Sequence, residues 1–211
     1  MTNQPEQNQP AAHQRWVLLI YRVPTEPPGR RTYVWRQLKQ LGAIYLQQAA
    51  AVLPERPELH TALNALVARI EEYTGDASLL QTTSPNLAWE QRLIGRFNEA
   101  RDAEYAEVVE NVERFEDEVR REDRKGRFHF AQLEDLEAEL QKLEQWLERI
   151  FRRDFFGAPG RAAALAALER GEAALEAFTT EVYAHEEVDG DGHKSLAGQQ
   201  DATTGSTACG G

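Results

Sequence analysis

The chain has 211 residues, of which 41% are hydrophobic, and it carries a formal net charge of −11. This length allows one or two domains with a hydrophobic core, and the hydrophobic content excludes a chain that is disordered throughout. The single cysteine excludes a disulfide framework and a cysteine-based metal site, and the longest apolar runs are too short to span a membrane. The N-terminus lacks the pattern of a signal peptide, so these features together predict a cytoplasmic protein.

The first half of the predicted fold alternates strands with helices. The predicted strands are 16–21, 43–47, 49–53 and 76–83, and the predicted helices are 30–41 and 58–73. Apolar runs rich in strand formers indicate the strands, and apolar residues at helix spacing indicate the helices. This βαββαβ order is that of a ferredoxin-like domain, in which two helices cover one face of a four-stranded antiparallel sheet. The other face then needs a cover from a partner or from the rest of the chain.

After residue 85 the composition changes to that of long helices. Apolar residues three or four apart predict a helix over 87–123, and a third helical segment is expected over 159–185. Between them lies a seam of apolar residues at heptad spacing, formed by Leu133, Leu136, Leu140, Leu143, Leu147 and Ile150. The seam is shorter than three heptads, which favours an antiparallel helical hairpin over an extended coiled coil.

The predicted fold class is therefore α+β: a ferredoxin-like βαββαβ domain followed by an α-helical hairpin or three-helix domain. The predicted boundaries are a disordered arm over 1–13, the ferredoxin-like domain over 14–84, the helical domain over 85–187 and a disordered tail over 188–211. The arm and the tail are predicted from their polar composition and their lack of apolar periodicity.

The positive charge of the chain is concentrated near its N-terminus. Residues 1–48 contain six Lys or Arg and two Glu, a net charge of +4, so the rest of the chain carries −15. Within this segment, the candidates for DNA or anion binding are Arg22, Arg30, Arg31, Arg36 and Lys39. Arg30 and Arg31 open a helix, where free backbone N–H groups add positive potential. Such a cluster suits DNA phosphates or a small oxyanion such as chromate, and equally a solvated helix surface.

A second charged group consists of Arg101, Asp102, Glu104, Arg152 and Arg153. An anion site and a salt-bridge network both fit this group, and the network is favoured because buried charges are normally paired. None of the five histidines is paired with another at metal-ligand spacing, and no catalytic motif is evident. We therefore expect a non-enzymatic protein with no catalytic residues, no metal and no cofactor.

Four segments carry a resemblance to a known family: 15–54, 97–119, 125–147 and RRDFFGAP at 152–159. Over roughly 14–186 the chain resembles the N-terminal part of the ChrB family, regulators of bacterial chromate resistance. The resemblance implies a transcription regulator whose partners are DNA upstream of its own operon and chromate or a similar oxyanion. An exposed sheet face or the leucine seam would also support a homodimer, whereas no membrane partner is expected.

A weaker similarity of layout extends to the PaaX-type repressors and to the CRISPR spacer-acquisition nucleases. The metal-dependent nuclease activity of the latter is tied to an Asp at the end of the first strand, where this chain has Arg22. Because hard divalent cations need oxygen ligands, a nuclease is disfavoured. The function predicted is a non-enzymatic regulator of chromate resistance that binds DNA through its basic N-terminal patch. The alternative is a small-oxyanion-binding or adaptor protein without DNA contact.

Overall fold

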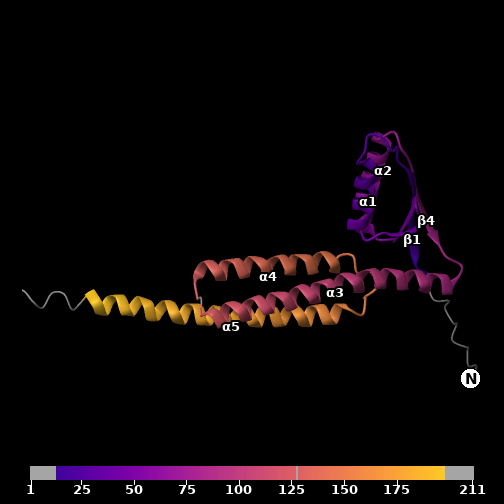
Figure 1. Cartoon of the computed structure of the whole chain (residues 1–211). Helices are drawn as coiled ribbons and strands as arrows, with labels where there is room; N and C mark the ends of the chain where they lie inside the picture. Colours follow the sequence, from indigo (N-terminus) through magenta and orange to yellow (C-terminus); the bar gives the residue numbers. More distant parts are fainter. Residues whose placement is uncertain (1–12, 127, 198–211) are drawn as a thin grey trace, which may run out of the picture. The chain divides into compact units, whose positions relative to one another are not determined.

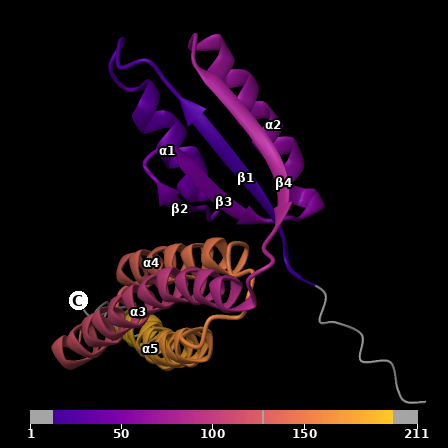
Figure 2. The same cartoon turned by 90° about the vertical axis from the view of Figure 1, so that its right-hand side faces the viewer.

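The computed structural model describes residues 13–126 and 128–197 of the chain. The elements follow the order β1, α1, β2, β3, α2, β4, α3, α4 and α5 (Figures 1 and 2). The chain divides into two compact units, which do not coincide with the N- and C-terminal halves of the sequence. The first unit contains the residues up to 104 together with 149–159, and the second contains 105–148 and the residues from 160 onward.

The first unit is built on one four-stranded sheet. Its strands are β1 (Arg15–Arg22), β2 (Ile44–Gln47), β3 (Ala50–Pro54) and β4 (Asp76–Thr83), and its first two helices are α1 (Arg30–Gln40) and α2 (Pro57–Glu72). The strand order is β2-β3-β1-β4, and every neighbouring pair is antiparallel. This arrangement confirms the predicted ferredoxin-like order, with β1 at the centre of the sheet and β4 at one edge.

One face of the sheet is covered by α1 and α2. Successive residues of a strand point to opposite faces, and in β1 Val17 and Leu19 point to the helix side. There they pack with Val34 and Leu38 of α1 and with buried leucines of α2. All of these side chains are less than a tenth exposed, so they form a continuous core between the helices and the sheet.

The opposite face of the sheet is covered in part by the first turns of α3 (Leu87–Lys125). Trp16 of β1 stacks on Phe97 with 5.8 Å between ring centroids, and Leu93 is buried in the same cluster. Phe156, from the segment before α5, also contacts Trp16 and Phe97. The residues that complete the second core of the sheet thus lie beyond the predicted boundary at residue 84.

The second unit is a set of three helices: the C-terminal part of α3, α4 (Phe130–Phe151) and α5 (Arg161–Ala197), which lie side by side (Figure 1). All six residues of the leucine seam on α4 are buried. The helices converge at Gly171, where an added Cβ would lie 3.2 Å from Val112 and 3.4 Å from Leu140. Heptad spacing on α4 thus serves packing within this chain.

Helix α5 continues as far as Ala197, and so includes residues 188–197, for which the sequence analysis predicted a disordered tail. Once a helix has formed, each further residue adds one backbone hydrogen bond, which lets a long helix run through residues of low propensity. The predicted arm over 1–12 and the tail from 198 lie outside the described residues. No helix in the described ranges is long and apolar enough to cross a membrane.

Candidate functional site

An open cleft of about 1220 Å³ lies at the C-terminal end of β1. Its walls come from the end of β1 and the loop that follows, from one side of α1 and from the turn between β2 and β3. The segment Val23–Gly29 leaves the strand because three prolines cannot continue a central strand. Gly29 has φ +99°, and α1 starts directly after it without a side-chain N-cap or an acidic residue in its first turn.

One face of α1 supplies the cleft with alternating charge and aromatic surface. Arg31, Trp35 and Lys39 are spaced four residues apart, so they share a helix face, and all three line the cleft. The indole of Trp35 is 48% exposed, which is unusual for an aromatic residue of this size. Arg22, from the end of β1, adds a third cation to the lining.

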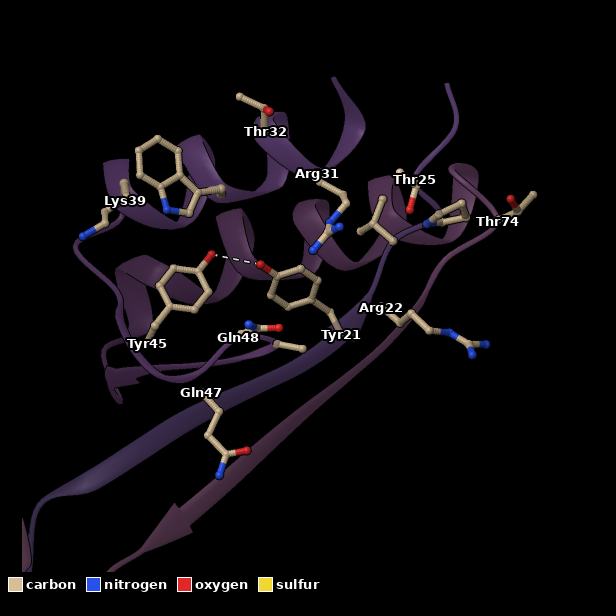
Figure 3. A pocket seen from close by; sticks show the side chains of 14 residues that line it. Tyr21, Arg22, Thr25, Arg31, Thr32, Lys39, Tyr45, Gln47, Gln48 and Thr74 are labelled. Atoms are coloured by element: carbon tan, nitrogen blue, oxygen red, sulfur yellow. Dashed lines mark hydrogen bonds between the residues drawn. The ribbon is translucent and has the colours of Figure 1, made fainter. Parts of the chain in front are cut away.

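Two tyrosines, one from β1 and one from β2, form another wall. The hydroxyl oxygens of Tyr21 and Tyr45 lie 2.9 Å apart in a hydrogen bond, drawn as a dashed line in Figure 3. The side chain of Arg31 points from α1 toward this pair, whereas Arg22 and Lys39 point outward at opposite ends of the cleft (Figure 3). Burial, followed by the hydrogen bond to Tyr21, raises the pKa of Tyr45 far above its usual range, so its phenol stays protonated.

The five predicted binding residues are not equivalent in the structure. Arg22, Arg31 and Lys39 line the cleft, and Arg36 is exposed on α1 outside the lining. Arg30 turns away: its guanidinium donates a 3.1 Å hydrogen bond to the Tyr73 carbonyl oxygen and lies 5.0 Å from the Tyr73 ring centroid. Within the described part of the chain, Arg22, Arg31, Arg36 and Lys39 make no ion pair through their side chains.

The cleft also contains residues that the sequence analysis did not single out. These are Tyr21, Tyr45, Trp35, Gln47 and Gln48, together with three threonines. The tyrosines belong to apolar strand runs, where core packing is the usual role of an aromatic residue. Only Trp35 carried a usable signal, since it lies four residues from both Arg31 and Lys39.

The second charged group forms a salt-bridge network within the first unit. Arg101 is only 5% exposed, and its Nη2 lies 2.9 Å from Oε1 of Glu104. The guanidinium of Arg153 binds both oxygens of the same carboxylate, at 3.3 and 2.8 Å. Asp102 is partly buried and Arg152 is exposed. One carboxylate thus joins the two guanidiniums, as in a salt-bridge network.

The electrostatics of the cleft favour an anionic ligand of extended shape. Three cations, two phenol groups and two amides offer donors to phosphate-type oxygens, and Trp35 offers a stacking surface. The volume is larger than the roughly 300–1,000 Å³ of a typical small-molecule pocket. No group of three or more His, Cys, Asp or Glu in the described ranges is placed to hold a metal ion.

These features define an α+β protein with a ferredoxin-like sheet and a basic cleft at the end of its central strand. The chain belongs to the ChrB family: the family model described as Protein ChrB, N-terminal, matches residues 31–189. The matched range includes Arg31 and Lys39 on α1 as well as the whole salt-bridge network. Arg22 and the rest of β1 lie before it.

One curated relative is similar to part of the chain. Protein ChrB of Cupriavidus metallidurans is 32% identical over 92 residues, which is 44% of this chain and 28% of the relative. The chain therefore matches well under two thirds of the length of that relative. No solved structure matches the chain.

Proposed function

We propose that this chain is a non-enzymatic regulator of chromate resistance that binds DNA through the basic cleft on α1. The observation that carries the proposal is that Arg22, Arg31 and Lys39 all line one cleft, with no ion pair to neutralise them among the described residues. Membership of the ChrB family supports the regulatory part of the proposal. Arg36 extends the basic surface along α1, and the DNA bound is the operator upstream of the protein's own operon.

A duplex phosphate backbone suits the cleft because it offers a row of negative charges to cations that are spread over a helix. Each phosphate that a Lys or Arg neutralises releases counterions, so the affinity should fall as the salt concentration rises. Such contacts position a protein on DNA without reading its sequence. Trp35 and the amides of Gln47 and Gln48 are placed in the same cleft to contact sugars or base edges.

The second candidate function is binding of chromate or a similar oxyanion without DNA contact. It is favoured by the hydroxyl pair of Tyr21 and Tyr45, toward which Arg31 points. A protonated phenol and a guanidinium together donate charge-assisted hydrogen bonds to an oxyanion. In a regulator, the same contacts would let the anion compete with a DNA phosphate for Arg31.

Fluorescence anisotropy of the full chain on labelled upstream DNA tests these functions. We expect salt-dependent binding that chromate weakens, and a reduction of the log–log salt slope by about one in Arg31→Glu or Lys39→Glu. Arg114→Glu is the matched control, because it makes the same charge change at an exposed arginine that does not line the cleft. Arg114 lies on α3, where it pairs with Glu110.

The outcomes separate the candidates. Absence of DNA binding at low salt, with chromate binding retained, would reject the DNA regulator in favour of the oxyanion protein. An equal loss of affinity in Arg114→Glu and Arg31→Glu would mean that overall charge, and not the cleft, holds the DNA.

A further inference from the structure

Strand β4 leaves one edge of the sheet unpaired. It is the last strand of the order β2-β3-β1-β4, and no described residue pairs with its outer side. It pairs with β1 over eight residues without a bulge, from Arg15 opposite Thr83 to Arg22 opposite Asp76. Such an edge presents a row of free N–H and C=O groups, for which a second strand is the natural partner.

After its first residue, Asp76, strand β4 carries none of the devices that usually block edge pairing. Between Ala77 and Thr83 there is no charged residue and no proline. Natural proteins protect exposed edges with lysines, prolines, bulges or very short strands. A long, regular and uncharged edge is therefore available for pairing rather than protected from it.

Two other apolar surfaces, the leucine seam and the second face of the sheet, are largely used within the chain. The leucine seam of α4 is buried, and Trp16, Leu93 and Phe97 close much of the second sheet face. What remains exposed and apolar on that face is Ile20 of the inner strand β1, 44% exposed, and Leu80 of the edge strand β4, 48% exposed. Both have even residue numbers and lie on the same face as Trp16.

We propose that β4 pairs antiparallel with β4 of a second copy of this chain, with Leu80 opposite the partner's Leu80. A two-fold axis perpendicular to the sheet keeps every side chain on its own face, so the register must be centred on a residue. Centring it on Leu80 sets Ser78 opposite the partner's Thr82 and brings the two exposed leucines together. No charge between 77 and 83 meets a like charge in this register, which leaves the strand self-complementary.

The dimer has a consequence for the cleft, and this consequence rests on the proposed DNA binding. The two sheets become one sheet of eight strands, with α1 and α2 of both copies on the same side. Both clefts then lie on one side of the dimer and are related by a two-fold axis. A two-fold DNA-binding protein reads two half-sites of a palindromic operator, which is the arrangement that paired clefts would serve.

Sedimentation equilibrium of the full chain tests the pairing without DNA. We expect the wild type to reach twice its chain mass of 23.9 kDa as its concentration rises. Leu80→Lys and Leu80→Glu should each remain monomeric, because like charges would face each other across the axis. An equimolar mixture of the two variants should dimerise again, since opposite charges then occupy the paired positions.

Ile20→Lys is the matched control. It adds the same charge to the same sheet face but lies on β1, away from the edge, and should leave the dimer intact. A wild type that stays monomeric, a dimeric Leu80→Lys variant or a mixture that stays monomeric would each overturn the proposal. Loss of the dimer in Ile20→Lys would overturn it too, in favour of stacked sheet faces.

The two proposals can fail separately. A dimer of the expected behaviour that does not bind DNA would reject only the proposed function. A monomer that binds DNA with a steep salt dependence would reject only the strand pairing.

Discussion

The phenols of Tyr21 and Tyr45 bring two weakly acidic groups together at the wall of the cleft. Burial of Tyr45 costs its anionic form most, and the hydrogen bond to Tyr21 adds to that cost. The raised pKa keeps the Tyr45 hydroxyl protonated. The pair therefore contributes neutral polarity beside the charge of Arg31.

This pKa shift predicts a loss of stability in alkaline solution. The unfolded chain releases the Tyr45 proton above about pH 10, whereas the folded chain keeps it. The unfolded state then binds fewer protons, so the free energy of unfolding falls as the pH rises above that value. Thermal melts at increasing pH should show this decline in the wild type and a shallower one in Tyr45→Phe.

Tyr21→Phe is the informative comparison. Burial is the larger cause of the shift, so removing only the hydrogen-bond partner should leave most of the alkaline decline in place. If Tyr45→Phe and the wild type lose stability in parallel, Tyr45 does not cause the decline.

For single residues, the sequence identified the charged side chains but not the residues that they contact. It grouped Arg30 with the binding residues because both Arg30 and Arg31 open α1. The structure separates them, since Arg30 bonds the carbonyl of Tyr73, 43 positions along the chain, while Arg31 faces the cleft. Which of two adjacent side chains meets a distant residue depends on tertiary packing, and no local pattern records it.

Among the elements, the segment 149–159 contributes to the core of the first unit, although most of it lies outside helices and strands. It brings Arg153 to Glu104 and Phe156 to Trp16, so it fastens α3 to the sheet. The approach is close at Gly42, which follows α1 with φ +83°. A Cβ there would lie 3.1 Å from both the Arg153 Cβ and the Phe155 ring.

Gly42→Ala should therefore cost more than the same change at Gly29. Both glycines have positive φ, and an alanine at either position carries backbone strain of about 1–2 kcal/mol. Only Gly42 has close neighbours, so overpacking should add about 1–3 kcal/mol there. Urea unfolding of the two variants measures the difference. Equal losses of unfolding free energy in the two variants would mean that Arg153 and Phe155 leave room for a Cβ at residue 42.

The sequence located most elements to within one or two residues, because long amphipathic patterns and Pro or Gly stops are local signals. β4 was predicted over the same residues that the structure shows, and α1 differs by one residue at its end. The division of α3 between the two compact units could not be predicted in the same way. The pattern of α3 shows an apolar stripe, but it does not say that Leu93 and Phe97 pack on a sheet while Val112 and Phe115 pack on helices.

For the whole molecule, the first unit is made from two separate stretches of chain. Residues 85–104 and 149–159 complete the core that Trp16, Ile44 and Val52 begin. A fragment that contains only 14–84 keeps all four strands and both covering helices. It would nevertheless expose the second face of its sheet to water.

We expect this fragment to be much less stable than the full chain. The indole of Trp16 is 1% exposed in the full chain and would lose its contacts with Phe97 and Phe156. In Trp35→Phe fragments the remaining emission reports Trp16 alone, and it should shift to the red and accompany binding of a hydrophobic dye. A cooperative melt with buried Trp16 emission would contradict this expectation. The Trp35→Phe full chain is the control for the substitution.

Because the first unit consists of two separate stretches of chain, it cannot complete its folding early in translation. All four strands emerge early, but the segment carrying Phe155 and Phe156 is translated only after the intervening helices have been made. At roughly 5–20 residues per second this interval lasts several seconds. During this interval, the second face of the nascent sheet lacks its contacts with Phe155 and Phe156, so part of its apolar surface stays exposed. The growing chain is therefore a candidate client for ribosome-associated chaperones well before synthesis ends.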